Sequence, residues 1–215
     1  MIDWNNAIDS YLKSKERRKD TYEPDLFSAS SVSGCIRQCV RTRLGLGTLS
    51  PQTLRHFHIG HEIHRLIQTE VALGHIGEPV EFEKQISFTM DGIRFKGHID
   101  CVSASEVIDF KSTSSIPVTT SYPTSKAYLY QLAIYKEGLE RLTPGTHPIR
   151  ETVIVYIDKR NLNTHRKIVT TPPMSEILFF CRQVIEAEKI YAKSRILPPK
   201  CAEACFSCKN EVPTC

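Results

Sequence analysis

The sequence lacks any apolar run that approaches the roughly 20 residues needed to span a bilayer. Its start, from Met1 to Asn6, lacks a basic region followed by an apolar one, so we expect no secretion signal and a cytoplasmic location. Internal repeats and low-complexity stretches are also missing. With 215 residues and the charged and apolar fractions of ordinary soluble proteins, the chain is predicted to form one well-buried domain with small extensions.

A large excess of one charge is missing as well, because 28 lysines and arginines stand against 24 aspartates and glutamates, a net charge of +4. This mild value permits nucleic-acid binding without requiring it. Basic residues cluster between Lys13 and Lys19 and again at Arg37, Arg41 and Arg43. Each cluster is typical of a solvated helix face, and a track for phosphate groups is the alternative.

Cysteines, by contrast, are numerous and unevenly spread. Four of the eight lie in the last fifteen positions, at Cys201, Cys205, Cys208 and Cys215. Cys35 and Cys39 lie far upstream. Because a cytoplasmic chain keeps its thiols reduced, clustered cysteines indicate metal binding before disulfides. Cys101 and Cys181 have apolar neighbours and are predicted to be small core residues.

The hydrophobic pattern predicts an alternation of helices and strands. The expected helices cover 3–18, a segment from Ser28, Ser30 or Ser31 to 46, then 51–74, 125–142 and 173–195; the expected strands cover 79–90, 93–102, 106–112, 151–158 and 164–170. This order is typical of an α/β domain with a mixed central sheet. The cysteine tail must return to the body of this fold if it is to meet Cys35.

The strands 93–102 and 106–112 are predicted to form a hairpin. Asp91-Gly92 is a turn signal before the first strand, and residues 103–106 form the second turn. If that turn is centred between residues 104 and 105, Asp100 lies opposite Asp109, with their Cβ atoms roughly 5 Å apart. Lys111 follows by two residues and points to the same face. The opposite face carries an apolar set suited to a core, namely Ile99, Cys101, Ile108 and Phe110.

Two opposed aspartates repel each other and raise each other's pKa unless a cation lies between them. Oxygen ligands suit Mg²⁺ and Mn²⁺. The pair Asp100 and Asp109, with Lys111 beside it, therefore has the groups that metal-dependent phosphodiester hydrolysis needs. The alternative is a surface hairpin in which Asp109 and Lys111 merely form an ion pair.

Two of the predicted helices add polar candidates. His64 lies near the apolar side of helix 51–74, either as an ordinary buried or surface histidine or as a ligand. Gln131 and Tyr135 lie one turn apart on the same face of helix 125–142. They belong either to an ordinary helix with a half-buried tyrosine or to a nucleic-acid contact, since both donate hydrogen bonds to phosphate oxygens and tyrosine stacks on bases.

The cysteine tail has the spacing of a metal site. Cys205 and Cys208 are separated by two residues, and Cys215 follows after six more. A short loop of this kind can place thiolates around zinc or an iron–sulfur cluster. With Cys201 the tail alone holds four thiols, which also permits a self-contained zinc site. Unligated thiols are the third option, and their ready oxidation counts against it.

Taken in order, these signals resemble the RecB-like PD-(D/E)XK nucleases, and among them most closely the CRISPR-associated exonucleases of family four. The motifs that carry the resemblance are Cys35, Gly60-x3-His64, Gly97-x2-Asp100, Asp109-x-Lys111, Gln131-x3-Tyr135 and the tail cysteines Cys205, Cys208 and Cys215. A similar iron–sulfur arrangement occurs in bacterial AddB-type subunits and in eukaryotic replication helicase–nucleases. Each motif is weak, but their conjunction in this order, from about residue 30 to 215, is specific.

The resemblance implies a restriction-endonuclease-like core over 51–197, an N-terminal helical region over 1–50 that contributes one cluster cysteine, and a cluster-binding tail over 198–215, all in one compact unit. It further implies a role for each motif residue. The groups that look like ligands of Mn²⁺ or Mg²⁺ are His64, Asp100, Asp109 and the backbone carbonyl of Phe110, and Lys111 looks like the catalytic lysine that acts with the two aspartates. Gln131 and Tyr135 match the motif that positions DNA. The ligands of an iron–sulfur cluster are matched by Cys35, Cys205, Cys208 and Cys215. Such a cluster would join the first and last parts of the chain.

The tail departs from the family pattern. The family's last spacing is C-x2-C-x5-C, whereas six residues separate Cys208 from Cys215 here. Cys39 and Cys201 are additional thiols, and either is an alternative ligand. Most members hold a 4Fe–4S cluster and some a 2Fe–2S cluster, so the 4Fe–4S form is the expectation.

The implied function is metal-dependent hydrolysis of single-stranded DNA, as an exonuclease from the 5′ end, in the preparation of DNA for CRISPR spacer acquisition alongside the CRISPR integrase complex. One alternative is an accessory DNA-binding subunit without catalysis, whose tail binds zinc or a cluster; the complete set of two acids and a lysine argues against it. Another is a nuclease of recombination or viral replication, which the lack of a helicase segment disfavours.

Overall fold

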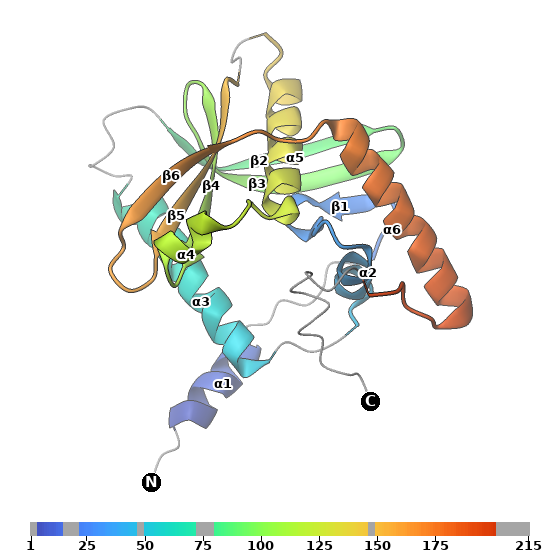
Figure 1. The fold of residues 1–215 in the computed structure, drawn as a ribbon, viewed down its shortest axis with the longest axis horizontal. Coiled ribbons are helices and arrows are strands. Elements are labelled where there is room, and N and C mark those ends of the chain that lie inside the picture. The colour runs from blue at the N-terminus through green and yellow to red at the C-terminus, as the bar shows by residue number, and fades with distance from the viewer. Residues whose placement is uncertain (1–3, 15–21, 47–49, 72–79, 146–148, 201–215) are drawn as a thin grey trace.

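Figure 1 shows a mixed central sheet with helices packed along it, in a computed structural model that describes residues 4–14, 22–46, 50–71, 80–145 and 149–200. The strands are β1 (Leu26–Ser28), β2 (Glu81–Met90), β3 (Ile93–Val102), β4 (Glu106–Thr113), β5 (Glu151–Asp158) and β6 (Thr164–Val169). Their order is β1-β3-β4-β5-β6, and β2 also pairs with β3. The pairs β1–β3 and β4–β5 are parallel and the other three are antiparallel. The predicted α/β class with a mixed sheet is confirmed.

The long helices form where the sequence predicted them. They are α1 (Trp4–Ser14), α2 (Ile36–Leu44), α3 (Pro51–Arg65) with its continuation η2 (Leu66–Val71), α5 (Lys126–Leu142) and α6 (Met174–Ser194). Ser50 starts α3 by accepting a hydrogen bond from the Thr53 amide at 3.1 Å, and Ser125 starts α5 in the same way. No helix within the described segments is long and apolar enough to cross a bilayer.

Three short elements were not predicted: β1, the turn η1 (Ala29–Ser31) and α4 (Ile116–Ser121). The prediction that a serine between residues 28 and 31 caps the second helix is wrong, because α2 begins at Ile36. That serine segment forms β1 and η1 instead. A strand of three residues is too short to show an alternating pattern, and β1 is fixed by its non-local pairing with residues 94–96 of β3.

The hairpin of β3 and β4 has the predicted register. Cys101 faces Ile108 and Val102 faces Val107, so the paired residue numbers sum to 209. The described pairing of these strands ends at Cys101. One residue earlier, the side chain of Asp100 contacts the neighbouring strand: its Oδ2 accepts a hydrogen bond from the backbone amide of Phe110 at 2.7 Å. The hairpin therefore opens at the position where the two aspartates stand.

Two apolar cores cover β4 on its two faces. Val107 belongs to the larger core, which the sheet forms with α5 and α6, and Phe110 belongs to a smaller one with Ile63 of α3. The predicted single apolar face is divided between them: Cys101, Ile108 and Phe110 pack in the smaller core, whereas Ile99 packs in the larger. As a result, Asp109 lies at the centre of a three-layered arrangement of α5, sheet and α3.

Arg43 joins three parts of the fold. Its Nε donates to Glu188 Oε1 of α6 at 2.7 Å, and the two side chains are only 6% and 2% exposed. Its Nη1 donates to the Leu26 carbonyl of β1, and its guanidinium lies 3.8 Å from the Phe27 ring centroid. The prediction of a solvated face or phosphate track is therefore wrong for Arg43, which is a buried, fully paired arginine.

Candidate active site

The end of β4 carries an aspartate and a lysine in direct contact. Lys111 Nζ donates to Asp109 Oδ1 at 2.9 Å and lies 2.7 Å from Asp109 Oδ2. Asp109 is fully buried, and Lys111 is 19% exposed. Side chains two apart on a strand share a face, so this contact is built into β4. Lys111 shares a face with Asp109 as predicted, and the two form the ion pair that the alternative reading expected, although at a buried position rather than on a surface hairpin.

Asp100 and His64 reach the same point from other elements. Asp100, at the opening of the hairpin, is 8% exposed and is held by the Phe110 amide. His64 extends from the last turn of α3, with its Nδ1 3.7 Å from Asp100 Oδ2 and its ring edge-on to the Phe110 ring. Hydrogen bonding to the Phe110 backbone also acts on the imidazole. The structure thus brings together His64, both aspartates and the Phe110 backbone, the groups that the family resemblance names as metal ligands.

Burial dominates the protonation of the two acids. It raises the pKa of Asp100 to about 6 and that of Asp109 to about 6, although the Lys111 ammonium lowers both. Within the described part of the chain, Asp109 Oδ2 is the buried side-chain oxygen that accepts no hydrogen bond. Lys111 Nζ lies 2.7 Å from this oxygen as an ion-pair partner, but a carboxylate oxygen has two lone pairs, so Asp109 Oδ2 can take a further partner such as a cation.

At neutral pH Lys111 is charged and His64 is neutral. Burial alone would lower the pKa of the Lys111 ammonium, but the adjacent Asp109 carboxylate raises it above its ordinary value, so Lys111 stays charged. Burial and the Lys111 charge lower the pKa of His64, which is therefore a neutral imidazole with a free lone pair. Lys111 is suited to stabilising negative charge rather than to removing a proton.

A second face of the site comes from α5. Gln131 Oε1 accepts from Lys111 Nζ at 3.1 Å, and Gln131 Nε2 donates to the Tyr135 hydroxyl at 2.8 Å. Both residues are buried, and burial raises the pKa of Tyr135. The glycine of the Gly97-x2-Asp100 motif has a steric reason, because a Cβ at this position would lie only 2.9 Å from the Tyr135 ring. The sequence placed Gln131 and Tyr135 beside DNA, whereas here their polar groups bond to Lys111 and to each other.

The donor set fits a divalent cation in its chemistry. With both acids ionised, the two carboxylates, one ammonium and one neutral imidazole leave a net charge of −1 at a buried point. Carboxylate oxygens with one imidazole suit Mn²⁺ and Mg²⁺. No three acidic, histidine or cysteine side chains of the described residues gather closely enough to hold a metal ion as they stand. At this site Lys111 lies against both oxygens of Asp109.

Residues 37–209 match the family model of the PD-(D/E)XK nuclease superfamily. The chain belongs to this superfamily. No protein of curated function matches the sequence.

Two solved structures resemble this PD-(D/E)XK nuclease. The crystal structure of SSO0001 aligns with a TM-score of 0.58 at 15% identity, covering 91% of this chain and 90% of that one. A protein from Eubacterium rectale, provisionally named an exonuclease, aligns with a TM-score of 0.51 at 14% identity, covering 100% of this chain and 95% of that one. At such low identity the likeness shows the fold alone.

Glu83 is an acid of this nuclease that sequence reasoning missed. The β2–β3 register pairs Phe82 with Cys101 and Lys84 with Ile99. Glu83 therefore lies opposite Asp100, and its own backbone φ is 52°. Its charge raises the pKa of Asp100. The Asp91-Gly92 turn fixes this register, so counting outward from that turn would have found Glu83.

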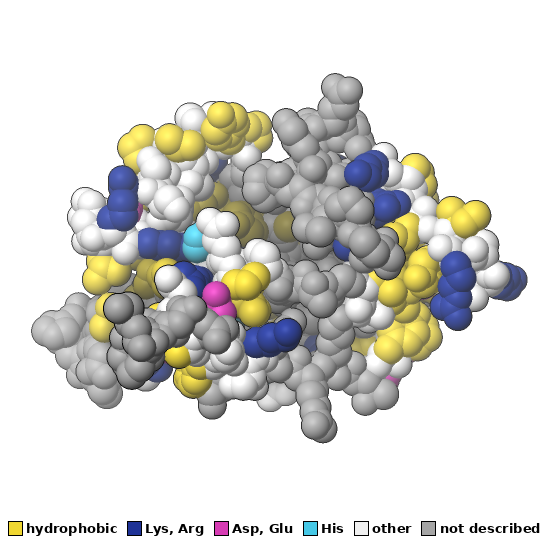
Figure 2. Space-filling view, turned by 90° about the horizontal axis from the view of Figure 1, so that it is seen from below, with side chains coloured by type: hydrophobic (Ala, Val, Ile, Leu, Met, Phe, Trp, Pro, Cys, Tyr) yellow, Lys and Arg dark blue, Asp and Glu magenta, His cyan; other side chains and the backbone are white. Residues whose placement is uncertain are grey.

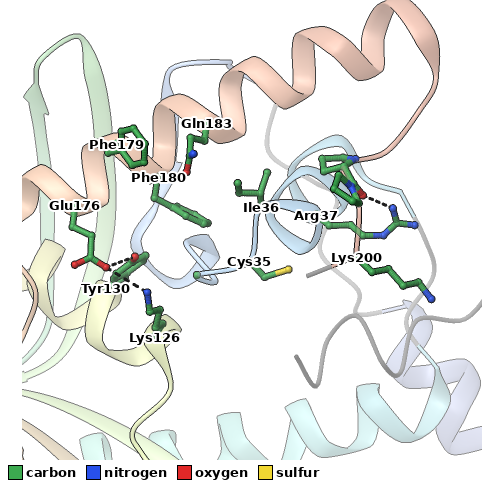
Figure 3. Close-up of a pocket in the computed structure, with 13 residues that line it drawn as sticks. Cys35, Ile36, Arg37, Lys126, Tyr130, Glu176, Phe179, Phe180, Gln183 and Lys200 are labelled. Carbon is green, nitrogen blue, oxygen red and sulfur yellow. Dashed lines mark hydrogen bonds and ion pairs between the residues drawn. The ribbon is translucent and has the colours of Figure 1, made fainter. Parts of the chain in front are cut away.

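Cys35 and Cys39 lie in different surroundings. Cys35 lines a cavity of about 500 Å³, which Pro198, Pro199 and Lys200 also line. Figure 3 shows Cys35 with its sulfur atom and Lys200 among the lining residues. Cys39 is fully buried, and its Sγ donates to the Ser31 carbonyl at 3.0 Å. The chain thus returns to Cys35 just before residue 201. Cys201, Cys205, Cys208 and Cys215, the other predicted thiols, lie outside the described residues.

Cys101 and Cys181 are core residues, as predicted, with 3% and 0% exposure.

Figure 2 shows lysine and arginine side chains in several separate groups on one face of the molecule, beside an acidic and a histidine side chain. On the described part of that face the basic groups do not form one continuous track.

The account of Asp109 predicts that this carboxylate destabilises the metal-free fold. Its folded pKa of about 6 exceeds the unfolded value, so ionisation costs stability as the pH rises from about 4 through 6. In the presence of a chelator at pH 7.5, Asp109→Asn should therefore raise the free energy of unfolding by on the order of 2 kcal/mol. Urea denaturation from pH 4.5 to 7.5 measures the gain, which should shrink toward the acid end.

Asp25→Asn is the matched control, because a hydrogen bond from Arg94 lowers the pKa of the half-exposed Asp25. This variant should gain no stability as the pH rises. If Asp109→Asn is less stable than the wild type at pH 7.5, the protein's own groups satisfy the carboxylate and the site needs no cation.

Proposed function

We propose that this PD-(D/E)XK nuclease is a metal-dependent deoxyribonuclease that hydrolyses single-stranded DNA, as an exonuclease acting from the 5′ end. The observation that carries the proposal is the fully buried Asp109 carboxylate, whose Oδ2 accepts no hydrogen bond among the described residues. The single Lys111 ammonium beside two buried acids leaves an excess negative charge when both acids are ionised, and a bound cation would offset it. Such a centre is suited to metal-assisted hydrolysis of phosphodiesters.

His64, Asp100, Asp109 and the Phe110 carbonyl would hold Mn²⁺ or Mg²⁺. The bound ion would polarise the scissile phosphate and lower the pKa of a water molecule. Because His64 is neutral and imidazole suits Mn²⁺ better than Mg²⁺, we expect a preference for Mn²⁺. The charged Lys111 would stabilise the negative charge that develops on the phosphate. Gln131 holds the Lys111 ammonium in place and is held in turn by Tyr135.

The second part of the proposal is an iron–sulfur cluster. By the family resemblance, the 4Fe–4S form is favoured over the 2Fe–2S form. The support for the cluster is the position of Cys35 at a cavity that the last described residues also line. Arg37 Nη1 donates to the Pro198 carbonyl at 2.5 Å, which fixes this return of the chain. Cys205, Cys208 and Cys215 would supply the other ligands. The cluster would act as a cross-link between the two ends of the fold.

The biological role we favour is DNA end processing for CRISPR spacer acquisition, in contact with the CRISPR integrase complex. Its support is the ordered set of sequence motifs. A role in recombination or viral replication uses the same chemistry and differs only in pathway. An accessory subunit without catalysis is less consistent with the intact contact between Lys111, Asp109 and Gln131.

The catalytic assignment predicts that Asp109→Ala or Lys111→Ala lowers Mn²⁺-dependent degradation of single-stranded DNA by roughly 10³-fold, the range of losses seen when transition-state charge stabilisation is removed. The assay uses strands labelled at the 5′ or the 3′ end, with Mn²⁺, Mg²⁺ and chelator. Early release of the 5′ label as short products would fit the proposed polarity.

His64→Ala and His98→Ala form a matched pair. His98 is an exposed histidine of β3 and is none of the proposed metal ligands, so its removal should leave cleavage and metal dependence unchanged. His64→Ala should raise the Mn²⁺ concentration needed for half-maximal activity. Undiminished cleavage by folded Asp109→Ala and Lys111→Ala variants would rule out this site.

The cluster assignment predicts that Cys35→Ser, purified without oxygen, loses the absorption near ~400 nm that iron–thiolate centres give. Cys39→Ser is the control, because a serine hydroxyl can donate to the same Ser31 carbonyl as the thiol does. It should keep the colour and the iron content. Colourless wild-type protein with bound zinc would contradict the iron–sulfur assignment and favour the accessory-subunit reading.

A further inference from the structure

The Lys111 ammonium has a third neighbour besides Asp109 and Gln131. Its Nζ lies 4.9 Å from the centroid of the Tyr128 ring. Tyr128 and Gln131 are three residues apart in α5 and therefore face the same way. One helix thus presents an amide oxygen and an aromatic face to the same cation. Tyr128 belongs to none of the motifs that identify the superfamily in this sequence.

The two α5 groups hold the ammonium by different physics. Gln131 accepts one of its hydrogen bonds at 3.1 Å. The face of an aromatic ring attracts a cation through its quadrupole, and it leaves the N–H groups available to oxygen acceptors. The ring also replaces water on one side of Lys111, whose side chain is 19% exposed. The nitrogen is therefore confined from two directions without losing its capacity to donate.

The ring is itself firmly placed. Tyr128 is half-buried and packs against the larger core. It lies in the first turn of α5, where its amide donates to the Ser125 carbonyl at 3.0 Å. The Ser125 side chain caps the same turn through the Ala127 amide. A ring held by a capped helix and a core can fix the position of a flexible lysine, which would otherwise have four rotatable bonds.

We propose that Tyr128 is a positioning residue that acts through Lys111: its aromatic face holds the ammonium where it meets the developing charge on the phosphate. This inference rests on the proposed catalytic role of Lys111. A purely structural Tyr128 would serve the core alone, and loss of its ring would then affect stability without a selective effect on the chemical step.

Two substitutions separate the ring from the volume of the side chain. Tyr128→Phe keeps the aromatic face and removes the hydroxyl, whereas Tyr128→Leu keeps an apolar side chain and removes the face. We expect Tyr128→Leu to lower kcat for single-stranded DNA about tenfold, a loss in the range of a partly desolvated cation–π contact. KM should change little, and Tyr128→Phe should restore most of the lost kcat.

Tyr122→Leu is the control, because Tyr122 is 67% exposed, in the segment that joins α4 to α5. It should leave both kinetic parameters at their wild-type values. Equal defects in Tyr128→Phe and Tyr128→Leu would assign the effect to the hydroxyl and overturn the proposal. A Tyr128→Leu variant with wild-type kcat, or with a raised KM alone, would overturn it as well.

A thermodynamic cycle tests the contact independently of nuclease activity. Urea unfolding is measured for the wild type, Tyr128→Leu, Lys111→Met and the double variant. We expect coupling: Tyr128→Leu should be less destabilising once Lys111 is gone. Additive effects would overturn the proposal. Coupling in a wild-type protein that cleaves no DNA would instead overturn the proposed function and with it the positioning role, while leaving the contact itself established.

Discussion

The burial of Asp109 next to Lys111 is the constraint on which the rest of the site depends. Three layers enclose this position, because α5 covers one face of β4 and α3 covers the other. Enclosure raises the pKa of Asp109 and Asp100, keeps Lys111 charged through its paired carboxylate, and leaves one carboxylate oxygen without a hydrogen bond among the described residues. A surface hairpin with the same residues would be screened by water and would have none of these properties. The layered fold therefore turns an ordinary ion pair into an electrostatically unbalanced centre.

Each neighbouring element contributes one group that contacts Asp100 or Lys111. The Phe110 amide donates to Asp100, the neutral imidazole of His64 approaches from α3, and Gln131 fixes the lysine from α5. These partners contact Asp100 and Lys111 but leave a net charge of −1 when both acids are ionised. A divalent cation and a phosphate group would complete the balance, which is consistent with membership of the PD-(D/E)XK nuclease superfamily.

Much of this arrangement could be predicted from the sequence, because strands and hairpins obey simple periodic rules. The two turn signals gave the register in which Cys101 faces Ile108, and alternation placed Lys111 beside Asp109. What failed depends on non-local structure. The strand β1 exists only through its pairing with β3, and the division of Ile99 from Cys101 follows from two separate cores. Arg43 appeared solvated because its partner Glu188 lies 145 residues away. Tyr128 gave no signal, because an aromatic residue on a helix has the same pattern whether it packs on a core or on a cation.

The central claim is that His64, Asp100, Asp109 and the Phe110 carbonyl form the cation site of a nuclease. Anomalous X-ray scattering from crystals grown with Mn²⁺ tests it most directly, because the signal locates the ion without reference to activity. The account predicts one strong peak in contact with both aspartates, with Asp109 Oδ2 as one of its ligands. A peak at another part of the molecule, or no peak and an unchanged contact between Lys111 and Asp109 at saturating Mn²⁺, would contradict it.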